Sequence, residues 1–143
     1  FATVAYYNIA AGIIAGLVAA VFGFWDWLSI PGGTRAKTIG LTHGIGNVII
    51  VVLFAISWLL RRGEANFIPD TAALVLSFAG LALALFTGWL GGELVYRLSV
   101  GVDRGAHLEA PNSLSGRPAT DHAGARSTRE AIPATGREHD EDR

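Results

Sequence analysis

Three long apolar segments, separated by short polar ones, make up the first two-thirds of the chain. The first runs from Phe1 to Trp25 without a charged residue, and each of the other two also contains a long run free of formal charge. Each segment exceeds the roughly 20 residues that a helix rising about 1.5 Å per residue needs to cross a bilayer core. The pattern predicts an all-α transmembrane helical bundle within residues 1–97, with helices at about 2–28, 38–60 and 71–96.

Turn and cap residues mark the ends of these helices. The sequence Pro31-Gly32-Gly33 ends the first helix and begins a short loop, whereas Asp70 or Thr71 is expected to cap the third. Trp25 lies near the end of the first segment, at the depth where aromatic rings settle beside lipid headgroups. The three segments therefore have the termini expected of spanning helices.

Small residues recur on one side of the first and third helices. At spacings of three or four residues, they share a helical face and allow close backbone approach, so we expect these faces to contact other helices. The faces consist of Asn8, Gly12, Ala15, Ala19, Gly23 and Asp26 in the first helix, and of Ser77, Gly80, Ala84, Thr87 and Gly91 in the third. The glycines assigned to helix packing are Gly12, Gly16, Gly23, Gly44, Gly80, Gly88, Gly91 and Gly92.

Residues 98–143 have a different composition, rich in Gly, Pro, Ser and charged residues without apolar periodicity. Such a segment cannot bury enough apolar surface to fold, which predicts a disordered tail. Over the whole chain 51% of residues are hydrophobic and only 16% charged, below the roughly 25% of soluble domains. Since the chain has no methionine, we expect further sequence before Phe1.

Charge and cysteine usage exclude several classes of function. The net charge of −1 leaves no basic surplus to bind nucleic acid. The absence of cysteine excludes disulfides, Cys-ligated zinc and iron–sulfur clusters held by this chain. The tail histidines His107, His122 and His139 lack metal-ligand spacing, so we expect no metal site. A nucleophile elbow and a metal-binding His-Glu pair are also missing, which makes an enzyme less favoured.

Five polar residues are expected to lie near one membrane face, because three helices bring the end of the first, the start of the second and the end of the third together. Polar groups within a membrane turn toward partners or a cavity, so we expect pairs between Asp26 and His43 and between Glu93 and Arg97. The cluster consists of Asp26, His43, Asn47, Glu93 and Arg97. The alternative is that His43 and Asn47 form a packing pair and that the charged residues only orient their helices.

The distribution of basic residues predicts an orientation. Arg35, Lys37, Arg97 and Arg104 lie on the side of the first loop and the tail, against Arg61 and Arg62 on the other side. The positive-inside rule therefore favours a cytoplasmic first loop and a cytoplasmic C-terminal tail.

Three motifs carry a resemblance to a known family: Phe22-Gly23-Phe24-Trp25-Asp26-Trp27, His43-Gly44-Ile45-Gly46-Asn47, and Trp89-Leu90-Gly91-Gly92-Glu93-Leu94-Val95-Tyr96-Arg97. From Phe1 to about Asp103 the chain resembles bacterial membrane proteins catalogued as domain of unknown function 2231. The resemblance implies a four-helix bundle, of which this chain lacks the first helix with its His-Pro type motif, in the bacterial inner membrane. Asp26, His43 and Asn47 match the family's polar positions. Leu98, however, stands where members often have a histidine, just after the Tyr-Arg pair. Some members are fused to Rieske domains.

Three functions remain open at this point. The first is a redox-associated membrane subunit in which His43 is an axial ligand of haem b and a missing helix supplies the other ligand. The second is a structural or accessory subunit that packs against other membrane subunits through its small-residue faces. The third is a proton or small-solute transporter that uses Asp26, His43 and Glu93. The lipid bilayer is an expected partner in all three.

Overall fold

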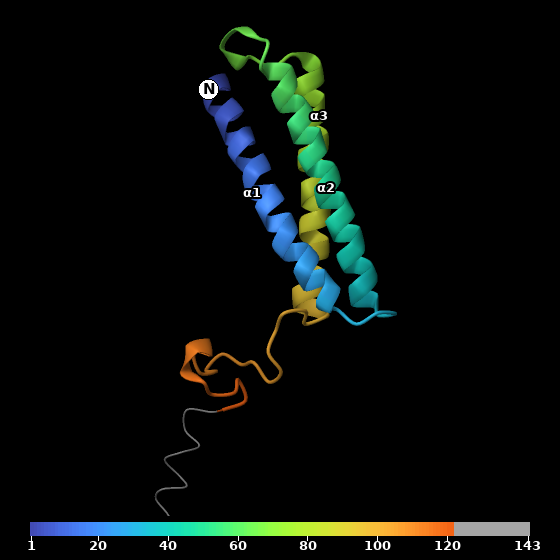
Figure 1. The fold of residues 1–143 in the computed structure, drawn as a ribbon, viewed down its shortest axis with the longest axis vertical. Coiled ribbons are helices and arrows are strands. Elements are labelled where there is room, and N and C mark those ends of the chain that lie inside the picture. The colour runs from blue at the N-terminus through green and yellow to red at the C-terminus, as the bar shows by residue number, and fades with distance from the viewer. Residues whose placement is uncertain (122–143) are drawn as a thin grey trace, which may run out of the picture. The chain divides into compact units, whose positions relative to one another are not determined.

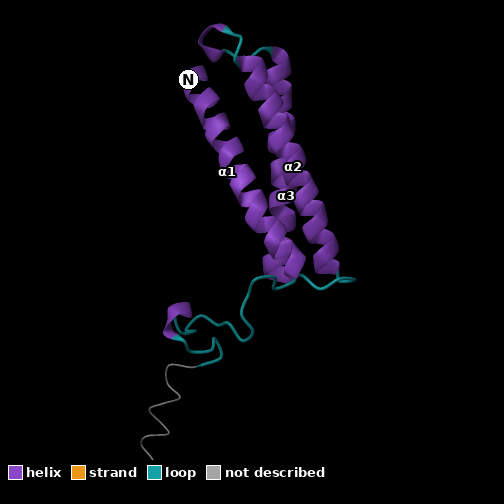
Figure 2. Cartoon of the chain, viewed as in Figure 1, coloured by secondary structure: helices purple, strands orange, loops and turns teal. Residues whose placement is uncertain are grey.

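The computed structural model describes residues 1–121, and every regular element in this part of the chain is a helix. Helix α1 spans Ala2–Ser29, α2 spans Arg35–Arg61 and α3 spans Thr71–Gly92 (Figure 1). A π-helical turn, η2, extends α3 over Glu93–Arg97, and two single 3₁₀ turns occupy Ala65–Phe67 (η1) and Ser113–Ser115 (η3) (Figure 2). All three long helices are long and apolar enough to cross a membrane, which confirms the predicted fold class.

The chain divides into two units, residues 1–100 and residues 101–143. The first unit contains the three long helices. In the second, residues 101–121 form turns around η3, and residues 122–143 lie outside the described part of the chain. The predicted disordered tail, residues 98–143, therefore lies partly outside the described residues, and its disorder stays a prediction.

Side chains at the helix ends set where the helices begin. Helix α2 starts at Arg35, a little before the predicted start, because the Thr34 hydroxyl accepts a hydrogen bond from the Lys37 backbone N–H at 3.2 Å. Asp70 caps α3 by accepting from the Ala73 N–H at 2.7 Å. The Lys37 ammonium donates to the Trp27 carbonyl at 2.6 Å, which places a cation at the C-terminal end of α1. These contacts fix the short α1–α2 loop.

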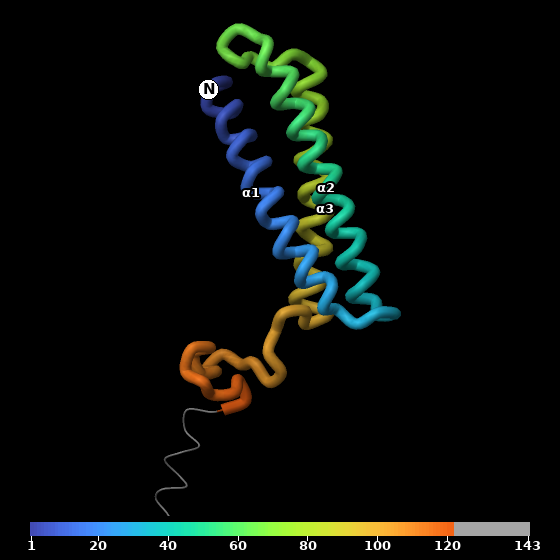
Figure 3. The backbone as a smooth tube through the Cα atoms, in the orientation of Figure 1, coloured from blue at the N-terminus to red at the C-terminus, as the bar shows by residue number. Residues whose placement is uncertain are grey.

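Helix α2 is the central helix of the bundle. It packs extensively against α3 and less extensively against α1, and Figure 3 shows the three helices running alongside one another. Glycines permit the close approach. A Cβ at Gly80 would lie 2.9 Å from the ring of Phe54, and one at Gly46 would collide with Thr87. The α2–α3 interface therefore has the small-residue packing expected between helices in lipid.

Helix α1 packs on α2 through a face different from the predicted one. Tyr6 is 7% exposed and lies between the rings of Trp58 and Phe67, with centroids 5.1 and 4.0 Å away. Further along α1, a Cβ at Gly16 would lie 3.1 Å from Val51. The predicted face is instead exposed at every position, namely Asn8, Gly12, Ala15, Ala19, Gly23 and Asp26.

Replacement of Gly80 by valine tests the close packing of α2 and α3. Because the added side chain would meet the Phe54 ring, we expect the free energy of unfolding in detergent to fall by about 1–3 kcal/mol. Gly88 of the same helix is the matched control, since nothing lies within 4 Å of its Cβ position. Equal stability of Gly80→Val and Gly88→Val in a denaturant titration would contradict the packing.

Candidate functional site

His43, Asn47 and Thr87 form a hydrogen-bonded network between α2 and α3. His43 Nδ1 lies 2.8 Å from the Thr87 carbonyl oxygen, and His43 Nε2 lies 2.9 Å from Asn47 Nδ2. The Thr87 hydroxyl donates to Asn47 Oδ1 at 3.4 Å and to the Ala84 carbonyl at 3.2 Å, two acceptors for its single proton. Since His43 and Asn47 are four residues apart, they share one face of α2 and both turn toward α3.

The partners of the His43 ring determine its protonation. A carbonyl oxygen only accepts, so the nitrogen facing Thr87, Nδ1, must carry a proton. Asn47 Nδ2 only donates, so Nε2 must offer a lone pair. The arrangement is complete for a neutral imidazole with its proton on Nδ1. Both ring nitrogens of His43 therefore already have partners.

Small residues make room for this network. A Cβ at Gly91 would lie 3.2 Å from His43 Cε1, and one at Gly46 would overlap the Thr87 methyl group. Gly46 and Thr87 are both buried. A larger side chain at either glycine would push α3 away from α2 and lengthen the hydrogen bonds of the histidine.

The charged residues of the predicted cluster lie elsewhere at this end of the bundle. Glu93, with a side chain 17% exposed, forms an ion pair of 3.6 Å with Arg35. Asp26 and Arg97 are exposed, and within residues 1–121 neither makes an ion pair with His43 or Glu93. The structure thus groups His43 with Asn47 and Glu93 with Arg35, rather than forming the expected pairs.

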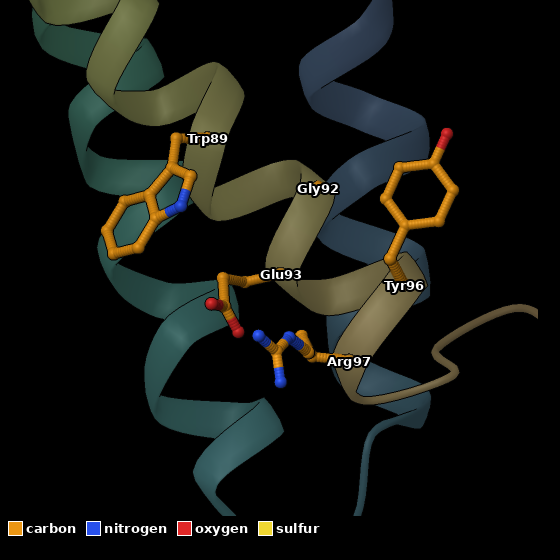
Figure 4. Close-up of a pocket in the computed structure, with 5 residues that line it drawn as sticks. All are labelled: Trp89, Gly92, Glu93, Tyr96 and Arg97. Atoms are coloured by element: carbon orange, nitrogen blue, oxygen red, sulfur yellow. The ribbon is translucent and has the colours of Figure 1, made fainter.

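The π-helical turn at the end of α3 borders an open hollow. Trp89, Gly92, Glu93, Tyr96 and Arg97 line it (Figure 4). In Figure 4 the side chains of Glu93 and Arg97 extend to the same side of the turn, whereas the Tyr96 ring points the other way. π-Helical turns often occur at functional sites, but this hollow is open and its acid already pairs with Arg35.

A second polar network lies at the opposite end of the α2–α3 interface, and the sequence interpretation missed it. Ser57 donates to the Ala73 carbonyl at 2.8 Å and lies 2.8 Å from the Ser77 hydroxyl, and Arg61 contacts both serines. From the sequence, Arg61 counts only as a loop charge. Its spacing of four residues from Ser57 was the available signal, because such residues share a helical face.

Apolar side chains separate these two networks. Phe54 of α2 packs against Gly80 of α3, and Val51 lies beside Gly16 of α1. In the described part of the chain, no hydrogen-bonded series of polar side chains connects Asn47 with Ser57. The middle of the bundle is therefore apolar.

The comparisons with known proteins agree with this architecture. Residues 1–104 match the family described as predicted membrane protein (DUF2231). The chain belongs to this family. The match covers all three long helices and confirms the resemblance drawn from the sequence motifs. No curated protein and no solved structure matches this DUF2231 chain.

The arrangement around His43 does not fit an axial haem ligand. Iron coordination requires an imidazole nitrogen with a free lone pair. In this DUF2231 chain Nδ1 donates its proton to the Thr87 carbonyl, and the Nε2 lone pair accepts from Asn47. Coordination would require the loss of one of these bonds within a closely packed interface. The network is instead suited to joining α2 to α3.

A double-mutant cycle on His43 and Asn47 tests this structural role. Loss of Asn47 leaves Nε2 without its donor, so Asn47→Ala should lower the free energy of unfolding by about 1 kcal/mol. The double variant with His43→Ala should lose less than the sum of the single losses. Thr42→Ala is the control, because the exposed Thr42 hydroxyl bonds only within its own helix, to Thr38. Strict additivity in denaturant titrations would show that the two side chains are uncoupled.

Proposed function

We propose that this protein is a small, non-catalytic helical subunit of a larger assembly in the bacterial inner membrane. The observation that supports this proposal is the uncovered small-residue face of α1, which we call the α1 face. It consists of Asn8, Gly12, Ala15, Ala19, Gly23 and Asp26, all of them exposed. In this proposal a helix of another subunit packs on the α1 face.

The dimensions and composition of the α1 face support helix docking. From Asn8 to Asp26 it extends for roughly 27 Å along the helix, close to the thickness of the hydrocarbon core. Nothing lies within 4 Å of a Cβ position at Gly12 or Gly23, so a second backbone has room to approach closely. Lipid chains would gain little from such a flat surface, whereas a partner helix gains van der Waals contact.

The polar side chain of Asn8 adds a second reason. Asn8 is exposed and makes no side-chain hydrogen bond within residues 1–121. An amide that faces hydrocarbon without a partner is costly, and a polar group on a neighbouring helix would satisfy it. Asp26 at the other end of the face would lie at headgroup depth, where water can solvate its carboxylate.

The redox and transport alternatives have less support. A haem-binding role for His43 conflicts with the complete hydrogen bonding of its ring. A transport route through the bundle would need polar groups at its centre, where Phe54 and Gly80 pack together. A Soret band in the purified protein that disappears in His43→Ala would restore the haem proposal.

We further propose that the α1–α2 loop faces the cytoplasm. Arg35 and Lys37 lie beside this loop, and Arg97 follows α3 at the same end of the bundle. At the other end Arg62 is exposed, whereas Arg61 is buried and paired with serines. The exposed positive charge is therefore concentrated at the loop end, which the positive-inside rule assigns to the cytoplasm.

Site-specific photo-crosslinking in native membranes tests the proposed subunit role. Because the chain lacks cysteine, Ala15→Cys and Val21→Cys can each carry a single photoreactive label. Ala15 lies on the α1 face, whereas Val21, 67% exposed, lies on a different side of α1. We expect an adduct with a second polypeptide, of higher mass than this protein alone, from position 15 and lipid adducts alone from position 21.

A larger side chain on the α1 face should weaken the association with the partner subunit. Gly12→Leu should weaken the association by about 1 kcal/mol or more, because the leucine occupies the space of the partner helix. Val21→Phe serves as the control and should leave the adduct from position 15 unchanged. Lipid adducts alone at both labelled positions would refute the proposed subunit role.

A further inference from the structure

Arg61 is a buried arginine without an acidic partner. It is the last residue of α2 and only 5% exposed. Its Nε donates to the Ser57 hydroxyl at 3.4 Å and its Nη2 to the Ser77 hydroxyl at 3.0 Å. In the described part of the chain no carboxylate forms an ion pair with it. A buried cation is expected to have a negative partner, so this site lacks one.

The hydrogen bonds of the two serines fix how they bind Arg61. The Ser57 proton goes to the Ala73 carbonyl, so Ser77 must donate to Ser57. Ser57 then accepts from both Ser77 and the guanidinium Nε, which fills its two lone pairs. Ser77 accepts from Nη2. One edge of the guanidinium, formed by the Nε and Nη2 protons, is therefore satisfied by uncharged oxygens.

The other edge of the guanidinium is free. A guanidinium carries five N–H groups in a fixed plane, and Arg61 uses two of them. Nη1 makes no hydrogen bond and is not among the fully buried side-chain atoms that lack partners, so it reaches the small exposed part of the residue. Nη1 and the second proton of Nη2 together form an edge with two parallel N–H groups, of which Nη1 reaches the surface.

A second donor at this end of the bundle also lacks an acceptor. One turn earlier on the same side of α2, the indole Nε1 of Trp58 is buried and lacks an acceptor. Glu64 and Asp70 lie at the same end of the bundle, but neither carboxylate forms an ion pair with Arg61 within residues 1–121.

The position of Arg61 in the membrane limits which class of anion could reach it. Tyr6, Trp58 and Phe67 stack together at the same end of the bundle, and such aromatic residues typically lie at the level of lipid headgroups. Phosphate groups are the oxyanions present at that level. Arginine pairs with phosphate through two parallel N–H···O bonds, which matches the free edge.

We propose that the free edge of Arg61 binds a phosphate oxyanion, supplied by a phospholipid headgroup or by free phosphate. The bound phosphate neutralises the buried guanidinium and links the end of α2 to the membrane interface. Ser57 and Ser77 act as positioning residues, since they hold the guanidinium with its free edge outward. This proposal does not depend on the subunit role of α1.

Thermal unfolding in dodecyl maltoside, a detergent without phosphate, tests the proposal. One series adds phosphatidylglycerol, a second adds inorganic phosphate, and a third adds potassium chloride at matched ionic strength. We expect saturable stabilisation in one of the first two series, which identifies the source, and none with chloride. Arg61→Gln should weaken the apparent affinity by at least about tenfold, the loss expected for charge-assisted hydrogen bonds.

Arg62→Gln is the matched control, because it removes an adjacent and exposed positive charge. It should retain the stabilisation seen in the wild type. If Arg61→Gln fails to fold, Arg61→Lys is the second variant. It keeps the positive charge but lacks the two parallel N–H groups of the guanidinium, so it should bind phosphate several-fold more weakly. Three results would each overturn the proposal. The first is equal stabilisation of the wild type and the Arg61 variants, and the second is a loss of stabilisation in Arg62→Gln as large as that in Arg61→Gln. The third is no stabilisation of the wild type in either phosphate series.

Discussion

Polar side chains of a membrane-spanning helix must find partners within the protein, and this constraint governs how α2 and α3 meet. The two helices share a hydrogen-bonded network at each end of their interface, one around His43 and one around Ser57. Each network uses side-chain and backbone oxygens that only close packing brings within reach. Gly46, Gly80 and Gly91 provide that closeness, so the glycines and the hydrogen bonds depend on one another.

Helix α1 is attached differently. Its contacts with the rest of the bundle include aromatic stacking of Tyr6 at one end and the Trp27–Lys37 hydrogen bonds at the other. Between them Gly16 meets Val51, and no side-chain hydrogen bond joins α1 to α2 across the apolar middle. A helix fastened mainly at its ends leaves most of its surface uncovered. The small-residue face of α1 therefore stays uncovered, whereas the small residues Gly80, Thr87 and Gly91 of α3 meet side chains of α2.

The sequence predicted the helices well because length, absence of charge and cap residues are local properties. It also allowed a packing pair between His43 and Asn47, since residues four apart share a helical face. It did not reveal which helix each face would contact. Spanning helices are apolar on all sides, so hydrophobic periodicity does not separate the inside from the outside as it does in soluble proteins. For this reason the sequence did not predict that the α1 face would be uncovered or that Glu93 would pair with Arg35.

Arg61 and Arg62 show the same limit at the level of single residues. In the sequence they are two equal charges that end a helix, and the positive-inside rule counts them equally. One step around the helix turns Arg61 toward Ser57 and Ser77 and leaves Arg62 exposed. Arg62 is then exposed at the interface, whereas Arg61 reaches it only through the free edge of its guanidinium. A count of basic residues therefore treats as equal two arginines whose surroundings differ.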